Sequence, residues 1–107
     1  MVNSIKLCGL IGLATKAGRV VMGTDACLEA IEKRSVKLIL LAQDASERTK
    51  THFTQTAQRL NIPISEILSI EEMSKAMGKV NKAVIGIKDT GFSKKMISVI
   101  NGGEDIG

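Results

Sequence analysis

Aromatic side chains are almost absent from this chain of 107 residues, which contains two phenylalanines and neither tyrosine nor tryptophan. Proteins that bind single-stranded nucleic acids stack successive bases on aromatic rings. The scarcity of rings therefore excludes a stacking platform of that kind. If the chain binds RNA, we expect it to use the shape, the backbone and the grooves of the RNA.

Groups that could hold a metal ion or a disulfide framework are equally few. The two cysteines, Cys8 and Cys27, and the single histidine, His52, show neither zinc-site spacing nor a disulfide pattern. We therefore expect no metal and no cofactor. Both cysteines are interpreted as small buried hydrophobes. Cys27 has an alternative, because a thiol in the first turns of a helix can have a lowered pKa.

Candidates for catalysis are isolated from one another. His52 falls on the polar face of a predicted helix, which is typical of a surface histidine. Asp89 could be a metal carboxylate, but an aspartate directly before a helix is ordinarily its N-terminal cap. No nucleophile is paired with a base. We therefore predict no catalytic residue and no enzymatic activity.

Long apolar runs are also missing. The longest, 7–14 and 38–42, are far shorter than the roughly 18 to 20 residues that a membrane-spanning helix needs. The N-terminal segment has no cluster of positive charges, so no signal peptide is predicted. We expect a cytoplasmic protein without membrane contact. Its length fits one domain, 1–107, with a glycine-rich tail at 101–107 that frays.

A nucleotide-binding loop is absent as well. Gly9 and Gly12 fall inside a helical pattern instead of between a strand and a helix, and no Gly-Lys-Ser or Gly-Lys-Thr sequence occurs. Close packing of that helix against a neighbour is the better explanation for both glycines.

Helical and strand periodicities alternate along the whole chain. The apolar run 38–42 predicts a central strand covered on both faces. Asp44 with Glu47 resembles a capping box, and Ser69 with Glu72 forms one, so each pair predicts the start of a helix. The alternation favours an α/β fold, a three-layer α/β/α sandwich. Its predicted helices cover about 4–17, 24–34, 44–60, 70–77 and 90–100, and its strands 19–22, 38–42, 64–68 and 83–87.

The charge balance favours a polyanionic partner. Fifteen Lys and Arg against eleven Asp and Glu give a net charge of +4. The joint 23–25 begins a helix, whose first backbone N–H groups lack partners and can bind an anion. If the first and last strands are neighbours, this joint and the basic loop 79–82 share one end of the sheet and face a phosphate backbone together. Solvated loop charges are the alternative interpretation.

Three segments carry a family resemblance: GLIGLATKAGR at 9–19, KLILLAQDAS at 37–46 and DTGFSKK at 89–95. With them the chain, from about residue 7 to residue 100, resembles the superfamily of kink-turn-binding ribosomal proteins of the L7Ae and L30e type, and within it the bacterial YlxQ-like branch. The resemblance implies a three-layer α/β/α fold around a four-stranded mixed sheet, and RNA binding without catalysis.

RNA-binding relatives carry a Gly-x-Asn-Glu-x-x-Lys pattern at the joint. Gly23 matches its glycine, whereas Asp25, Ala26 and Glu29 stand in place of the asparagine, the glutamate and the lysine. An ionised aspartate only accepts hydrogen bonds, alanine makes none with its side chain, and Glu29 reverses a charge that faces phosphate in the relatives. The second contact region of the family matches the loop 78–82, which is basic and presents the apolar Val80.

The resemblance thus implies a ribosome-associated, non-catalytic protein that binds structured, kink-turn-like RNA. We expect ribosomal RNA as its partner, ribosomal proteins as further candidate partners, and a monomer when free. The replacements at the joint leave open a second hypothesis, a protein-interaction module on the same fold that has lost kink-turn recognition. The predicted RNA contacts are Lys16, Arg19, Gly23, Thr24, Asp25, Lys79, Val80, Asn81 and Lys82.

Overall fold

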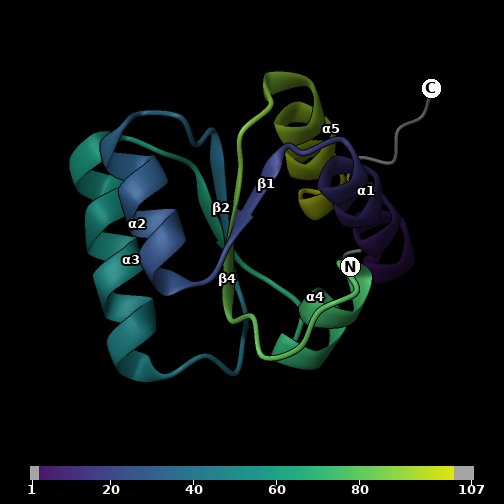
Figure 1. Ribbon diagram of the computed structural model, residues 1–107, viewed down its shortest axis with the longest axis horizontal. Coiled ribbons are helices and arrows are strands. Elements are labelled where there is room, and N and C mark those ends of the chain that lie inside the picture. The colour runs from purple at the N-terminus through teal and green to yellow at the C-terminus, as the bar shows by residue number, and fades with distance from the viewer. Residues whose placement is uncertain (1–2, 103–107) are drawn as a thin grey trace.

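Helices and strands alternate along the chain in the computed structural model, which describes residues 3–102 (Figure 1). The N-terminal part comprises α1 (Ser4–Lys16), β1 (Val20–Met22), α2 (Thr24–Glu32), β2 (Leu38–Leu41) and α3 (Glu47–Leu60). The C-terminal part comprises β3 (Ile64–Glu66), α4 (Ile70–Ala76), β4 (Val84–Ile87) and α5 (Thr90–Ile100).

The four strands form one mixed sheet in the order β1-β4-β2-β3. β4 is antiparallel to both β1 and β2, whereas β2 and β3 are parallel. Every residue of the two central strands, β2 and β4, is buried. The predicted four-stranded mixed sheet and the predicted central strand are therefore confirmed.

Helices cover both faces of this sheet (Figure 1). Alternate residues of each strand point to opposite faces, and each face has its own hydrophobic core. Cys27, Ile31 and Phe53 of α2 and α3 pack on one face, and Leu7 and Met96 of α1 and α5 belong to the core on the other. Burying a large apolar side chain contributes about 1.5 to 3 kcal/mol. The α/β/α sandwich predicted from the sequence is confirmed.

Side chains cap the first turns of several helices. The Asn3 side chain accepts the backbone N–H of Lys6 at 3.0 Å at the start of α1. Ser69 and Glu72 form the predicted capping box of α4. These bonds satisfy N–H groups that have no partner within a helix, and therefore fix where each helix begins.

The predicted cap at Asp44 is wrong. Ser46 caps α3, and its side chain accepts the backbone N–H of Thr49 at 3.1 Å. Asp44 Oδ1 instead accepts the backbone N–H of Ile70 at 2.8 Å, so this carboxylate serves the first turn of α4. Since that helix begins 26 residues further along the chain, the local sequence pattern carries no sign of the bond.

Some elements are shorter than predicted because the backbone turns earlier. Arg34 takes a left-handed conformation with φ of 60°, which a right-handed helix cannot include, so α2 ends at Glu32. Leu68, with φ of 64°, likewise lies beyond β3, which ends at Glu66. The strands also exclude the predicted flanking residues 19, 42 and 83.

The packing explanation for the two glycines of α1 holds for one of them. A side chain at Gly12 would meet the carbonyl oxygen of Ala76 in α4 at 3.2 Å, so the absence of a Cβ lets these helices approach. Gly9 is exposed, no atom of another element lies within 4 Å of the position that a Cβ would take, and the prediction of close packing there is wrong.

Within residues 3–102, no helix is long and apolar enough to cross a membrane. Of the tail predicted to fray, Asn101 and Gly102 form a turn, and the rest lies outside the described residues.

Candidate nucleic-acid interface

The pairing of β1 with β4 brings two distant segments to one end of the sheet. Met22 pairs with Ile85, and the backbone N–H of Gly23 donates to the carbonyl oxygen of Val84 at 3.0 Å. The joint 23–25 therefore lies beside the start of β4, into which the loop 78–82 leads. In Figure 1 the connections β1–α2 and α4–β4 both lie at the lower end of the molecule. We call this end the joint–loop surface and define it by residues 23–25 and 78–82.

The joint itself leaves the first turn of α2 open. Gly23 occupies the N-cap position with φ of 93° and provides no side-chain acceptor for the helix. The next three residues, Thr24, Asp25 and Ala26, are exposed. The first N–H groups of α2 thus lack an N-cap acceptor and lie at the positive end of the helix dipole, where an anion is favoured.

All three positions that differ from the family's pattern lie on the surface. Asp25 and Ala26 are exposed, and Glu29 forms an ion pair with Lys33 at 3.6 Å in which both side chains are more than 70% exposed. Such an exposed pair contributes little stability. These residues are therefore available to a partner, and the fold does not require them.

Hydrogen bonds to Ser74 anchor both ends of the loop 78–82 to α4. The backbone N–H of Lys79 donates to the Ser74 carbonyl oxygen at 2.8 Å. Ser74 Oγ accepts the backbone N–H of Lys82 at 2.8 Å and donates to the Lys82 carbonyl oxygen at 3.4 Å. Ser74 is buried, so water competes little for these bonds. Both ends of the loop are thereby fixed on one helix.

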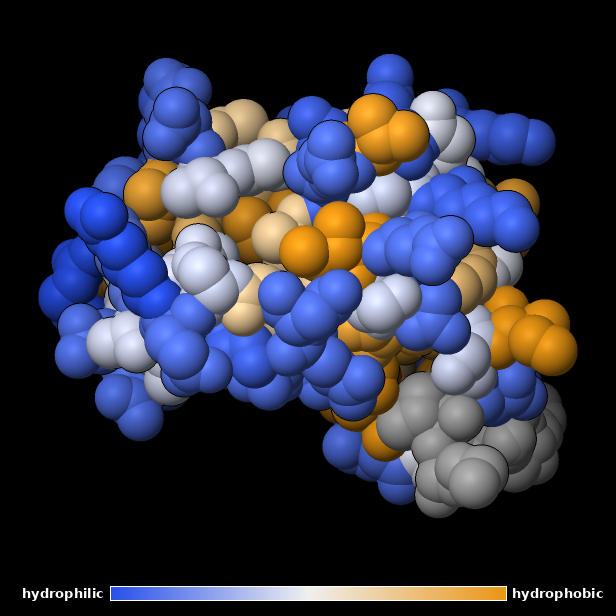
Figure 2. Space-filling view, turned by 90° about the horizontal axis from the view of Figure 1, so that it is seen from below, coloured by the Kyte–Doolittle hydropathy of each residue, from blue (hydrophilic) through white to orange (hydrophobic). Residues whose placement is uncertain are grey.

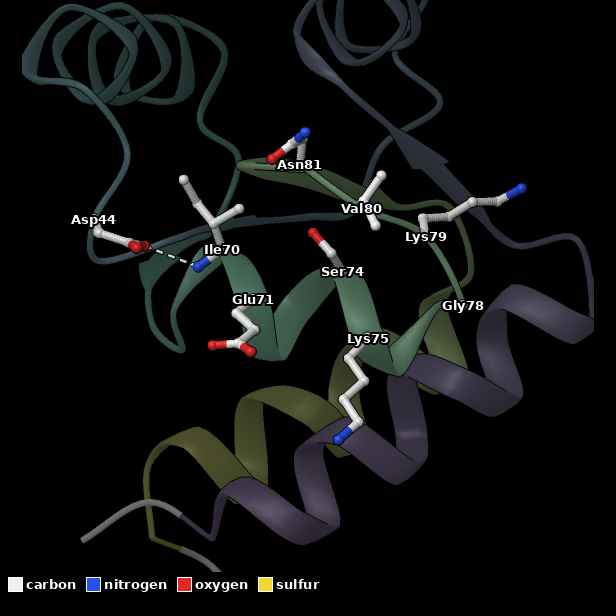
Figure 3. Close-up of a pocket in the computed structure, with 9 residues that line it drawn as sticks. All are labelled: Asp44, Ile70, Glu71, Ser74, Lys75, Gly78, Lys79, Val80 and Asn81. Carbon is white, nitrogen blue, oxygen red and sulfur yellow. Dashed lines mark hydrogen bonds between the residues drawn. The ribbon is translucent and has the colours of Figure 1, made fainter.

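Between these anchors the loop presents side chains to solvent. Gly78 and Asn81 take left-handed backbone conformations, with φ of 71° and 56°. Lys79 and Val80 are exposed, and 75% of the Val80 residue surface is accessible. Figure 3 shows Lys79 extending away from α4, while the Ser74 side chain points from α4 toward the loop.

A cavity of about 620 Å³ lies between this loop, α4 and the turn after β2 (Figure 3). Its lining is mixed in character, with the apolar side chains of Ile70 and Val80 beside charged and amide groups. Viewed from this end of the molecule, hydrophobic patches lie among hydrophilic residues (Figure 2). The lining residues are Asp44, Ile70, Glu71, Ser74, Lys75, Gly78, Lys79, Val80 and Asn81.

Sequence reasoning missed the α4 side of this cavity. The sequence pattern places Asp44 at the start of a different helix, and nothing in it marks Glu71 or Lys75 as part of a cavity. A signal was nonetheless present for Ser74, because serine within a short helix often bonds to a nearby backbone group.

Lys16 and Arg19 do not belong to the joint–loop surface. The carbonyl oxygen of Arg19 accepts the backbone N–H of Lys88 at 2.8 Å, which places Arg19 at the start of β1, beside the end of β4. Lys16 is in the last turn of α1, just before this point. In Figure 1 the connections α1–β1 and β4–α5 lie at the upper end, opposite the joint.

The remaining candidates for chemistry have structural explanations. Cys27 is fully buried, with its Sγ 3.4 Å from the Val21 carbonyl oxygen, and burial raises the pKa of its thiol to about 12. The packed interpretation is thus confirmed, and the reactive one is wrong. His52 is exposed, and Asp89 accepts the backbone N–H of Phe92 at 2.8 Å as the N-cap of α5. Residues 3–102 contain no cluster of acidic, histidine and cysteine side chains that could hold a metal ion.

Comparison with known proteins finds relatives along almost the whole chain. The RNA-binding protein YlxQ of Enterococcus faecium is 36% identical over 100 residues, which cover 94% of this chain and 96% of the relative. The RNA-binding protein YlxQ of Bacillus subtilis is 33% identical over 92 residues, which cover 86% of this chain and 92% of the relative.

Solved structures share the fold. A protein of unknown function from Bacillus halodurans superposes with a TM-score of 0.87 at 31% identity, covering 90% of this chain and 97% of that one. The Giardia lamblia 15.5kD RNA binding protein superposes with a TM-score of 0.77 at 17% identity, covering 94% and 87%. At that identity the second likeness shows the fold alone.

The family assignment rests on a match over most of the chain. The model of the ribosomal protein L7Ae/L30e/S12e/Gadd45 family matches residues 6–97. This family is non-catalytic, in agreement with the prediction that the chain is not an enzyme. The match, together with relatives that are more than 30% identical over nearly their full length, shows that the chain belongs to the ribosomal protein L7Ae/L30e/S12e/Gadd45 family.

Proposed function

We propose that this protein binds structured RNA at the joint–loop surface, with a kinked stem as the preferred target, and acts in the cytoplasm as a non-catalytic, ribosome-associated protein. One observation carries the proposal: the hydrogen bond from Gly23 to Val84 places an open helix N-terminus beside a basic loop. The relatives in Enterococcus faecium and Bacillus subtilis are named RNA-binding proteins, which supports RNA as the partner.

The two parts of the surface suit different parts of such an RNA. The open N–H groups at Thr24 and Asp25 and the ammonium group of Lys79 suit phosphate oxygens. Val80 and the cavity beside it suit an unstacked base, because a kink in a stem turns bases out of the helix and a base needs apolar contact and edge hydrogen bonds. The buried anchor at Ser74 holds the loop in place before RNA arrives, which lowers the entropic cost of binding.

The joint and the loop differ in their electrostatic attraction for an RNA backbone. Asp25 and Glu29 bring negative charge to the joint, and an RNA backbone near them is repelled. Lys79 and Lys82 oppose this repulsion from the loop. We therefore assign most of the electrostatic attraction to the loop, while the joint contributes its backbone donors.

Binding measurements with two RNAs test this proposal. Affinity for a kink-turn RNA and for a plain duplex is measured at several salt concentrations, for the unmodified protein and for Lys79→Glu and Lys82→Glu variants. Arg59→Glu is the control, since this exposed residue at the far end of α3 pairs with Glu32 and takes no part in the surface. We expect a preference for the kinked RNA that both loop variants weaken and the control retains. Equal affinity for the two RNAs would reject kink recognition, and unaffected loop variants would reject the loop as its site.

The protein-interaction module is the second candidate. It is favoured by the exposed Asp25, Ala26 and Glu29, which do not match the RNA-reading residues of the family. A pull-down from lysate, with and without nuclease, separates the two. Protein partners that persist after RNA digestion support the module, whereas partners that vanish with the RNA contradict it.

A further inference from the structure

A second group of cations lies at the opposite end of the sheet. The bond from the Lys88 N–H to the Arg19 carbonyl continues the β1–β4 register by one step beyond the pair Val20–Ile87, so Arg19 lies directly opposite Lys88. Residues opposite each other on antiparallel strands project to the same face of a sheet. Two positively charged residues, Arg19 and Lys88, therefore lie next to each other at this end of the sheet.

A further cation flanks Lys88 on the other side. The backbone N–H of Lys37 donates to the Ile87 carbonyl oxygen at 2.7 Å, which places Lys37 just before β2 and beside the end of β4. Lys16 ends α1 three residues before Arg19. We call Lys16, Arg19, Lys37 and Lys88 the distal basic surface. All four residues are exposed.

Within residues 3–102 none of these four cations has a carboxylate partner. The nearest acidic residue in sequence, Asp89, directs its carboxylate to the first turn of α5, where it accepts the Phe92 N–H. Elsewhere on the described surface, Lys33, Lys50 and Arg59 each pair with a glutamate. The distal basic surface thus carries uncompensated positive charge.

The fold gains nothing from this arrangement. Like charges directly opposite each other on neighbouring strands destabilise a sheet. A negatively charged ligand placed against Arg19 and Lys88 removes the repulsion and gains attraction from both.

One phosphate cannot reach both ends of the sheet. Lys88 directly follows β4, four residues beyond Val84, and at about 3.3 Å per residue this separates the two ends by about 13 Å. The distal basic surface therefore needs RNA beyond the segment held at the joint–loop surface.

We propose that the distal basic surface binds the phosphate backbone of a double-helical RNA segment, so that the domain bridges two RNA segments. The bridging part rests on the proposed function; backbone binding by the distal surface does not. Duplex backbone is favoured over single strands because the surface offers no aromatic ring for stacking. RNA is favoured over an acidic protein because lysine, three of the four residues, is depleted in protein–protein interfaces.

A salt titration with a plain RNA duplex tests backbone binding. It compares the unmodified protein with Arg19→Ala/Lys88→Ala and with the control Arg48→Ala/Arg59→Ala, which removes the same charge from exposed positions of α3. Each lost phosphate contact lowers the slope of log affinity against log salt by about 0.9, so we expect the distal variant to lose about 1.8 and the control to lose less than half of that. Equal slopes for the two variants would overturn the proposal. So would binding of polyglutamate to the distal surface in preference to the duplex, since an acidic protein would then be the partner.

Bridging is tested with two RNAs that carry a donor and an acceptor dye, a kink-turn RNA and a plain duplex. Energy transfer on adding protein supports bridging, and its loss in Arg19→Ala/Lys88→Ala but not in the control assigns it to the distal surface. If the kink-turn RNA does not bind at all, the proposed function fails while the duplex titration still decides the distal site. If both RNAs bind without energy transfer, bridging is overturned.

Discussion

Ser74 and Lys82 are joined by two hydrogen bonds, since Ser74 Oγ accepts the Lys82 backbone N–H at 2.8 Å and donates to the Lys82 carbonyl oxygen at 3.4 Å. One buried hydroxyl on α4 therefore fixes the end of the loop that presents Lys79 and Val80. Binding at this loop should therefore depend on a residue of α4 that lies outside the loop itself.

Replacing Ser74 by alanine removes both bonds and leaves a backbone N–H without its partner. We expect the free energy of unfolding to fall by about 1 to 2 kcal/mol. We also expect faster hydrogen exchange at the Lys82 amide and weaker binding of kink-turn RNA. Denaturant unfolding, exchange and a binding titration measure the three effects.

Ser93 provides a matched control for this prediction. Both serines are 3% exposed, but Ser93 Oγ is buried without a hydrogen-bond partner among the described residues. Ser93→Ala should therefore leave stability unchanged or slightly higher, with RNA binding intact. A Ser74→Ala protein that binds RNA as tightly as Ser93→Ala would show that the anchor does not matter for binding.

The Val80 side chain offers a second prediction. With 75% of its surface exposed, the residue contributes little to folding, so Val80→Ser should leave the unfolding midpoint nearly unchanged. If a base packs against Val80, losing two methyl groups costs on the order of 1 kcal/mol, a severalfold loss of affinity for kink-turn RNA. Leu13→Ser on α1, where the residue is 58% exposed, is the control. Equal affinities of the two variants would argue against a base at Val80.

Local patterns in the sequence predicted most of the fold. The features that they did not predict depend on hydrogen bonds between residues far apart in the chain. The run at 38–42 and the capping box at Ser69 are readable because all their residues are neighbours. The Asp44–Ile70 bond joins residues 26 positions apart, and a carboxylate near two helix starts gives no local sign of which one it serves. The cavity at α4 was missed for the same reason.

The sequence identified the segments of the candidate site, but the order of the strands determines which of these segments lie together. The sequence identified the joint 23–25 and the loop 79–82, but only the pairing of β1 with β4 makes them neighbours. That pairing also separates Lys16 and Arg19 from the joint. Lys37 and Lys88 escaped notice because single lysines beside strands become a surface only when those strands lie together.

The buried thiol of Cys27 should lower the free energy of unfolding at alkaline pH. Burial raises the pKa of its thiol from an ordinary value near 9 to about 12, so above pH 9 the unfolded chain releases a proton that the folded chain retains. Stability from this group is complete below pH 9 and falls between pH 9 and 12, by at most about 1.4 kcal/mol per pH unit. Cys27→Val lacks this group and keeps Cys8. Unfolding curves of the two proteins should diverge above pH 9, and parallel pH profiles would contradict the buried thiol.

Reversing the charge at Glu29 tests whether the joint faces RNA. Glu29→Lys restores the family's residue at this position and removes only an exposed ion pair with Lys33, so stability should change by about 0.3 to 0.5 kcal/mol. If RNA passes the joint, repulsion becomes attraction, and the affinity for kink-turn RNA should rise with a steeper salt dependence. Glu32→Lys makes the same charge change one turn further from the joint and also breaks an exposed ion pair, with Arg59. Because net charge alone would raise the affinity of both variants equally, only a larger gain for Glu29→Lys places the RNA at the start of α2, and equal gains would remove it from there.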